Sequence, residues 1–276
     1  MRFAVVGHVE WVTFVRVDHV PLAGEIENDE GWWESAAGGG PVAAAQLEKL
    51  AGRCTLYTAL GSDEVGVRAR AELEALGLRV EAAVRDAPTR RAFTFIDCAG
   101  ERTITTLGER LDPHADDALP WEELARADAV YVTAGDAGAL RAARSAKVLV
   151  ATSRVMDRLV EAEVFLDAVV GSGSDPSETC DPAVLARPPG LLVRTDGANG
   201  GSFETASGER GRFEAAPLPG PLVDAYGGGD SFAAGLTFAL AQGRPAHEAL
   251  AFASRCGAAC VTGRGPYERQ LTAAAL

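Results

Sequence analysis

Short apolar segments alternate with stretches of helical periodicity along most of the chain. Residues 3–6 are uniformly apolar, which is typical of a strand buried on both faces of a sheet. Comparable segments follow at residues 55–60, 80–84, 129–133, 147–151, 168–171 and 191–195. Helical spacing occurs at residues 41–50, 67–76, 231–242 and 247–262. Repeated strand–helix units of this kind predict a doubly wound α/β fold, with a parallel sheet between two layers of helices.

Two regions, at about 10–37 and 87–107, are extended and lack helical periodicity. Within them, residues 11–17, 91–97 and 103–107 have strand character, and Ala99-Gly100 between the last two is typical of a hairpin turn. We expect the two regions to pair as one small β lid over the ligand edge of a single domain, 1–276, because a lid would exclude water from a reactive phosphate. The alternative is two separate hairpins with no such role.

Composition excludes several classes of protein. The 276 residues include 26 Lys+Arg and 39 Asp+Glu, which gives a net charge of −13, and 47% are hydrophobic. Such a chain can bury a core, and it lacks the clustered basic residues with which a protein binds nucleic acid. No apolar run reaches the roughly 18 residues of a membrane span. The five cysteines are scattered without CxxC spacing, and the first residues resemble a core strand rather than a signal peptide, so we expect a cytoplasmic protein.

The segment 223–236 carries the strongest chemical signal. Gly227, Gly228 and Gly229 precede Asp230, and an apolar helical pattern follows. Glycine lets backbone N–H groups turn toward a ligand, and a helix N-terminus adds partial positive charge, so this segment can form an anion hole. A carboxylate beside bound phosphate suits a base that takes the proton of an attacking hydroxyl. The alternative is an ordinary helix N-cap, and the local pattern leaves both interpretations open.

Residues 224–232 (DAYGGGDSF) resemble the DTxGAGD signature of the ribokinase-like (PfkB) carbohydrate kinases, which also lies near the C-terminus in that family. Five further segments resemble family motifs in the family's order: 38–43 (GGGPVA, the first glycine signature), 61–66 (GSDEVG, the GxDxxG turn), 175–178 (DPSE, the NxxE motif), 195–201 (TDGANGG, the nucleotide loop) and 252–265 (the C-terminal helix with its Thr-x-x-Gly turn). The resemblance covers nearly the whole chain. It implies a ribokinase-like three-layer α/β/α fold with a small β lid.

By this resemblance, Asp230 is the catalytic base, and the N–H groups of Gly227, Gly228 and Gly229 hold the transferring γ-phosphoryl. The implied ATP-binding residues are Thr195, Gly197, Asn199, Gly200 and, near the adenine, Ser254. Glu178 would organise water around Mg²⁺, and Asp175 stands where the family has asparagine. Their alternative is structural, with Asp175-Pro176 as a helix start and Glu178 as a capping-box acid.

The substrate side departs from the family. Val12 stands where an aspartate is usual and Ala43 where an asparagine is usual, so two ligands for sugar hydroxyls are replaced by apolar groups. Gly39 and Gly40 keep the glycine signature, and Glu10 and Trp11, with Trp33 and Glu34, are candidate replacements. The alternative for the two tryptophans is that they pack the lid or a dimer interface. We therefore expect weak activity on free ribose or fructose and better activity on a substrate with an aromatic or less hydroxylated face. Arg91 or Arg102 could reach an anionic substrate group, or form surface ion pairs.

Together these features predict an ATP-dependent kinase that transfers the γ-phosphoryl to a hydroxymethyl group of a sugar or sugar-like molecule, with ATP and Mg²⁺ as cofactors. In the family such lids often pair across a two-fold axis, which implies a homodimer through the lid. The alternatives are a nucleoside or vitamin-like alcohol kinase of the same fold, or a non-catalytic binding relative. A Rossmann oxidoreductase is disfavoured, because Gly7-His8-Val9-Glu10 lacks the GxGxxG pattern after the first strand.

Overall fold

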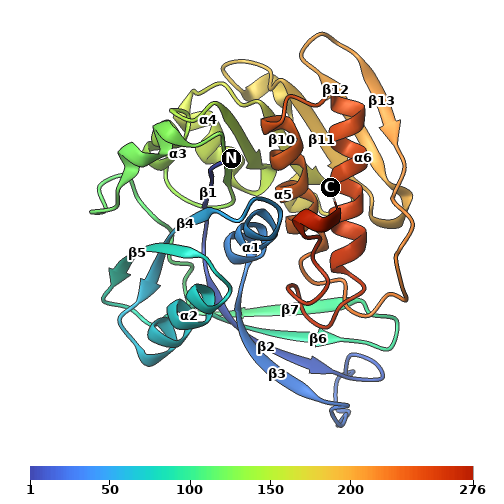
Figure 1. The fold of residues 1–276 in the computed structure, drawn as a ribbon. Helices are drawn as coiled ribbons and strands as arrows, with labels where there is room; N and C mark the ends of the chain where they lie inside the picture. Colours follow the sequence, from blue (N-terminus) through green and yellow to red (C-terminus); the bar gives the residue numbers. More distant parts are fainter. Residues whose placement is uncertain (276) are drawn as a thin grey trace.

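The computed structural model describes residues 1–275 and contains a nine-stranded main sheet in the order β13-β12-β11-β10-β9-β8-β1-β4-β5 (Figure 1). The strands are β1 (Phe3–Val6), β4 (Cys54–Gly61), β5 (Arg79–Arg85), β8 (Ala129–Val132), β9 (Val148–Thr152), β10 (Ala168–Ser172), β11 (Leu191–Thr195), β12 (Gly201–Thr205) and β13 (Arg210–Phe213). The seven strands from β11 to β5 are parallel, while β12 and β13 add antiparallel pairs at one edge. The predicted doubly wound fold is confirmed, while strands β12 and β13 and helices α3 (Ala137–Ala143) and α4 (Met156–Ala162) were not predicted.

Helices cover both faces of the main sheet, as Figure 1 shows. One layer contains α1 (Gly39–Ala51), α2 (Glu64–Ala75), α5 (Gly228–Ala241) and α6 (Ala246–Cys260), and the other contains α3 (Ala137–Ala143), α4 (Met156–Ala162) and the 3₁₀ turn η1 (Trp121–Arg126). Five shorter 3₁₀ turns are η2 (Ser153–Val155), η3 (Pro176–Glu178), η4 (Pro182–Val184), η5 (Gly197–Asn199) and η6 (Ala273–Ala275). Strand β1 has a core on each side: Phe3 stacks on Phe238 of α5, whereas Ala4 and Val6 pack in the other layer.

A second sheet of four strands, called the lid sheet below, has the order β3-β2-β6-β7. Its strands are β2 (Glu10–Arg16), β3 (Trp32–Ala37), β6 (Arg91–Ile96) and β7 (Arg102–Leu107). The two extended regions do pair, because β2 and β6 run parallel in register, and each carries its hairpin neighbour on its outer side. Edge strand β7 is exposed along its whole length. Pairing of two chains through this edge stays a prediction, as does the assignment of 1–276 to a single domain.

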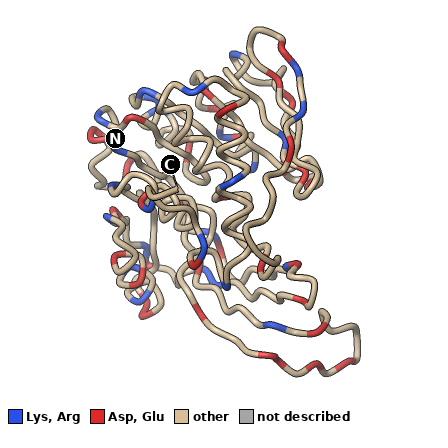
Figure 2. The backbone as a smooth tube through the Cα atoms, turned by 45° about the vertical axis from the view of Figure 1, so that its right-hand side comes forward, with Lys and Arg blue, Asp and Glu red and all other residues tan. Residues whose placement is uncertain are grey.

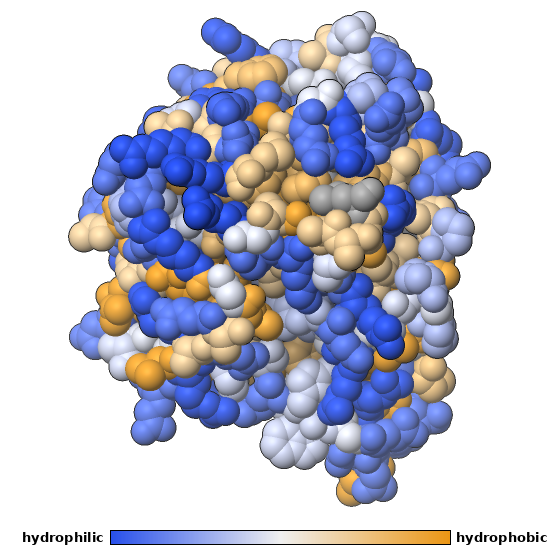
Figure 3. Space-filling view, viewed as in Figure 1, coloured by the Kyte–Doolittle hydropathy of each residue, from blue (hydrophilic) through white to orange (hydrophobic). Residues whose placement is uncertain are grey.

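The surface of the described residues is mixed in character. Hydrophilic and hydrophobic side chains are interspersed over the face drawn in Figure 3. Acidic positions are spread along the backbone in Figure 2, and several follow one another on the loop between β2 and β3. Within residues 1–275, no helix is long and apolar enough to cross a membrane.

The main sheet reverses its winding direction at β1, which lies between β4 on one side and β8 on the other. In open α/β sheets, ligands bind beyond the carboxyl ends of the strands at such a switch point. The turn before α1 packs closely against the residues that follow β1 and β8 at this switch point. A Cβ atom at Gly40 would lie 2.9 Å from the His8 carbonyl oxygen, and one at Gly7 would lie 2.7 Å from Gly40 Cα and 2.5 Å from Thr133 Oγ1.

This close approach predicts that Gly7→Ala destabilises the protein. The added methyl has no free space, so the α1 turn or the end of β8 must shift, at a cost of about 1–3 kcal/mol in the free energy of unfolding. Gly220→Ala is the matched control, because its Cβ would meet nothing nearer than Thr262 Cβ at 3.9 Å. Denaturant unfolding of both variants measures the difference, and equal stabilities would contradict the packing described.

Candidate active site at the switch point

The glycine segment before Asp230 forms the first turn of α5. The helix begins at Gly228, three residues earlier than the apolar pattern indicated, and its N-cap Gly227 has φ 82°. The side chain of Asp224 anchors the segment by accepting hydrogen bonds from the N–H groups of Tyr226 (2.8 Å) and Gly265 (3.0 Å). No side chain caps the helix, so Asp230 and Ser231 are not ordinary N-caps. The N–H groups of the first turn are therefore available to an anion.

Asp230 lies directly against the α1 turn. A Cβ at Gly39 would be 3.0 Å from Asp230 Oδ1 and 3.5 Å from Thr133 Oγ1, so a larger residue would push the carboxylate away from this turn. Burial raises the pKa of the Asp230 carboxyl to about 6, the positive charge of Arg102 opposes the rise, and the charge of Glu178 adds to it. A carboxylate with such a pKa is ionised at neutral pH yet accepts a proton more readily than an ordinary aspartate.

A second group of polar side chains lies where β1 leads into β2. Glu10 is 6% exposed, and its Oε1 is 3.3 Å from Arg90 Nε and 3.8 Å from His8 Nε2. Burial raises the pKa of Glu10, although Arg90 and Arg110 oppose it. Burial, with the positive charges of Arg110 and Arg90, lowers the pKa of His8 to about 3, so the imidazole is neutral at physiological pH. His8 and Arg90 were not predicted as site residues from the sequence. Their positions at the ends of expected strands could have indicated them.

The structure does not bring all the expected acceptor residues together. Trp11 belongs to the main core and lies under the guanidinium of Arg68, 4.4 Å from the ring centroid, and Glu34 pairs with the same arginine at 3.5 Å. Both lie on the face of the lid sheet opposite to Val12, which packs with Tyr226. We therefore assign neither Trp11 nor Glu34 to the acceptor site.

Trp33 and Ala43 also serve packing. The ring of Trp33 stacks on Phe14 with centroids 5.0 Å apart, and the guanidinium of Arg264 lies 4.2 Å from its centroid. Ala43 is fully buried in the main core. The apolar character expected at positions 12 and 43 is therefore real, and Trp33 packs against the cluster that contains Val12 and Tyr226.

The expected nucleotide residues gather around residues 213–215. Gly200 has φ 76°, and a Cβ there would clash with the Phe213 carbonyl oxygen and lie 2.8 Å from Ala215 N. Ser254 Oγ on α6 donates to the Glu214 carbonyl oxygen at 3.3 Å. Gly197, with φ 51°, and Asn199 bound the intervening turn η5. Thr195 begins this arrangement at the carboxyl end of β11, where its Oγ1 donates to the Gly171 carbonyl oxygen.

The two acids of the DPSE motif share one cation. Arg154 Nη2 lies 2.8 Å from Asp175 Oδ2 and 2.6 Å from Glu178 Oε1. Asp175 caps turn η3, as the structural alternative expected, but the other Glu178 oxygen accepts the N–H of Ser172 at 2.7 Å, so no capping box forms. Two carboxylates that already hold a cation between them fit a magnesium ion, which prefers hard oxygen donors.

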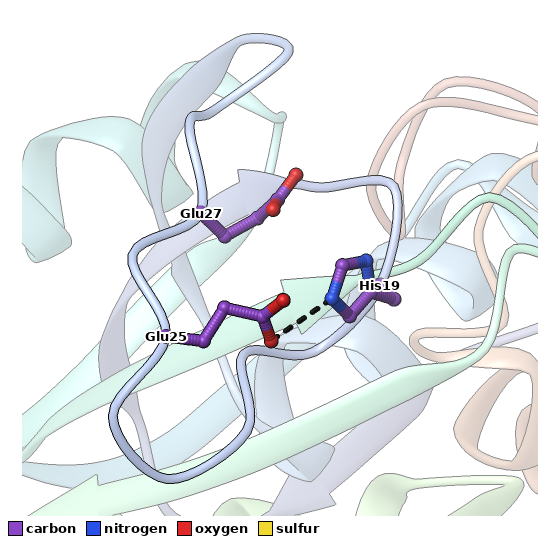
Figure 4. A group of neighbouring side chains, drawn as sticks. All are labelled: His19, Glu25 and Glu27. Carbon is purple, nitrogen blue, oxygen red and sulfur yellow. Dashed lines mark ion pairs between the residues drawn. The ribbon is translucent and has the colours of Figure 1, made fainter.

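A different acidic group lies on the loop between β2 and β3, at the opposite end of β2 from Glu10. His19 Nε2 is 3.0 Å from Glu25 Oε2, and Glu27 lies close by (Figure 4). Hydrogen bonds to Glu25 and Asp18 raise the pKa of His19, which favours the charged imidazole. These side chains form an ion-pair cluster on a surface loop, and we assign them to no site.

Similarity to known proteins agrees with this architecture. An ATP-dependent ribose-1-phosphate kinase of Halopiger xanaduensis is 27% identical over 94% of this chain and 91% of its own length. The structure of Arabidopsis thaliana ribokinase complexed with ribose and ATP superposes with a TM-score of 0.78 at 20% identity, covering 99% of this chain and 96% of that one. Adenosine kinase from Sinorhizobium meliloti gives 0.78 at 20% identity, covering 99% and 98%.

The model of the pfkB family carbohydrate kinases matches residues 2–172 and 166–273. These matches span the glycine turns, the lid sheet and the Asp230 segment. The chain therefore belongs to the pfkB family of carbohydrate kinases and is a phosphotransferase with an alcohol group as acceptor.

Proposed function

We propose that the protein is an ATP-dependent kinase that transfers the γ-phosphoryl group to a hydroxymethyl group of a sugar or sugar-like molecule. The observation that carries the proposal is the position of Asp230, whose carboxylate lies in the uncapped first turn of α5 and against Gly39 of the α1 turn. An acceptor between the two turns would meet both a base and an anion hole. A binding protein would have no use for a carboxylate there.

In the proposed reaction, Asp230 takes the proton of the acceptor hydroxyl while the hydroxyl oxygen attacks the γ-phosphorus. The bond from the γ-phosphorus to the bridging oxygen breaks, and ADP leaves with that oxygen. The N–H groups of the Gly227–Gly229 turn face the oxygens of the transferring group, so catalysis comes from positioning and from charge stabilisation. The lid sheet would keep water from competing with the acceptor.

The nucleotide would lie along the carboxyl ends of β10 and β11. Thr195 and the turn from Gly197 to Gly200 would contact its phosphates and ribose, and Ser254 would lie near the adenine. Asp175 and Glu178 are the residues that would hold Mg²⁺, releasing Arg154 as they do so. Bound there, the ion would neutralise charge on the nucleotide phosphates.

The identity of the acceptor can be tested with a panel of compounds. A relative that matches over most of the chain is named a ribose-1-phosphate kinase, and structural neighbours are named ribokinase and adenosine kinase. Sugars, sugar phosphates and nucleosides are therefore the acceptors to test. The experiment is ADP release by the wild-type protein with each compound in turn, and no acceptor-dependent release with any of them would contradict the proposal.

Asp230→Asn should lower phosphoryl transfer by at least about 100-fold, because the amide cannot take the hydroxyl proton. ATP affinity should stay within a few fold. Removing a charge that the folded protein disfavours should also raise the free energy of unfolding above pH 6, by about 1–3 kcal/mol. Single-turnover kinetics and denaturant unfolding measure both effects; near-normal transfer would exclude Asp230 as the base.

The raised pKa of Asp230 predicts the pH profile of kcat/KM for the acceptor. The base must be ionised, so kcat/KM should be constant above pH 6 and should fall about tenfold per pH unit below it. His8 is neutral throughout this range, because its pKa is about 3, and it adds no step. A profile that stays flat from pH 5 to 8 would show that a group other than Asp230 accepts the proton.

Glu178→Gln should raise the Mg²⁺ concentration for half-maximal activity by about tenfold or more. The amide oxygen can still accept the N–H of Ser172, so the fold should persist. Glu161→Gln is the control for loss of a charge, since Glu161 pairs with Arg158 in an exposed ion pair outside the site. If both variants keep the wild-type Mg²⁺ dependence, Glu178 has a structural role only.

A further inference from the structure

The face of the lid sheet that turns toward the site can be read from its register. Residues directly opposite one another in neighbouring strands share a face, and Val12, Ala92 and Thr106 form such a set. Val12 packs in one cluster with Tyr226, which directly precedes the glycine turn at Gly227. By the alternation of strand residues, this inward face also carries Arg16 and Arg102, which stand opposite Ile96 at the far end of β6.

Arg90 lies at the near end of the same face. It immediately precedes β6, and its backbone carbonyl oxygen accepts the N–H of Trp11 at 2.9 Å, which fixes its position. Its side chain is only 19% exposed and stands beside inward-facing Glu10. The next residue, Arg91, is exposed on the opposite face. Of the two neighbouring arginines, the one that reaches the site is therefore Arg90.

Several buried polar atoms here have no hydrogen-bond partner among the described residues. They are Arg90 Nε, His8 Nδ1, Thr94 Oγ1 and Thr133 Oγ1. A buried polar group left unsatisfied costs about 1–3 kcal/mol. Arg90 and His8 both lie beside Glu10, and Thr133 lies beside Gly39, so these groups indicate a position for a ligand at the site. Arg90 Nε can only donate, and the two hydroxyls can donate as well. A ligand group with several acceptor oxygens would satisfy Arg90 Nε and both hydroxyls.

The inward face of the lid sheet is more positive than the whole protein. The net charge is −13, yet this face carries Arg16, Arg90 and Arg102, and Glu10 is the carboxylate on it. Asp230 is a second carboxylate at the site, and Asp112 pairs with Arg110. Arg110, on the loop after β7, adds positive charge that acts on His8 and Glu10. A neutral sugar would not need this arrangement. A phosphate would, because guanidinium groups match its geometry and form stronger, charge-assisted hydrogen bonds with it.

We propose that the acceptor carries a phosphate ester at the end opposite its reacting hydroxymethyl group, and that Arg90 and Arg110, with His8, bind this phosphate under the lid sheet. The inference rests on the proposed kinase function and specifies its acceptor class. The phosphate contacts replace the hydroxyl ligands lost at Val12 and Ala43. Glu10 then accepts hydrogen bonds from ring hydroxyls between the phosphate and Asp230.

The test compares ribose 1-phosphate, whose 5-hydroxymethyl group is free, with ribose, which offers the same hydroxymethyl group without the phosphate. Wild-type kcat/KM should be at least about 100-fold higher for the phosphate ester. Arg90→Gln and Arg110→Gln should each lower it for the ester by about 10- to 100-fold, mainly through KM, and should change it little for ribose. Arg91→Gln, the outward neighbour, should change neither.

Arg110→Gln keeps the test valid if Arg90→Gln is unstable, because Arg110 is on the surface and, within residues 1–275, forms its ion pair with Asp112. Equal use of ribose and its phosphate by the wild type, or equal losses on both acceptors in the two variants, would overturn the inference while leaving the kinase function intact. If the wild type binds ATP but phosphorylates neither compound, the kinase function is judged on the other acceptors of the panel, and it fails if none of them is phosphorylated. Calorimetric titration of both compounds into the wild type and the same variants then tests the phosphate site independently of catalysis. The wild type must bind ribose 1-phosphate more tightly than ribose. Equal affinities would overturn the inference.

Discussion

The site depends on one close approach, between the turn that begins α1 and the turn that begins α5. Gly39 lies so close to Asp230 that a side chain there would crowd the carboxylate, and Gly227 has φ 82°, a conformation that favours glycine. Together the two turns enclose a carboxylate at an uncapped helix N-terminus. Enclosure disfavours its charge, whereas the helix terminus and Arg102 favour it, and the balance leaves a pKa of about 6. The stability lost by burying this charge is what would make the carboxylate an effective base in the proposed reaction.

The main sheet and the two glycine turns could be predicted from the sequence because each requires particular residue types. Strands buried on both faces must be apolar throughout, and turns that approach a neighbouring backbone must be glycine. Strands β12 and β13 have neither signal, since they are short, partly polar and at an edge. The start of α5 was misplaced by three residues because glycines that favour turns can still form the first turn of a helix.

The acceptor side could not be predicted in the same way. Whether Glu10 or Trp11 faces the site depends on a one-residue alternation, which only the pairing of β2 with β6 decides. The same alternation places Arg90 and Arg91 on opposite faces of the lid sheet. The burial of His8 depends on the α1 turn, which comes some thirty residues later in the chain. Tertiary contacts of this kind leave no periodic pattern in the sequence.

The central claim is that this chain transfers the γ-phosphoryl of ATP to a hydroxymethyl oxygen. The most direct measurement is ³¹P nuclear magnetic resonance of the products formed from ATP, Mg²⁺ and the best acceptor of the panel. The account predicts one new phosphomonoester resonance, split by the two protons of a CH₂–O–P group and equal in amount to the ADP formed. Release of inorganic phosphate with ADP, with no new ester, would contradict it.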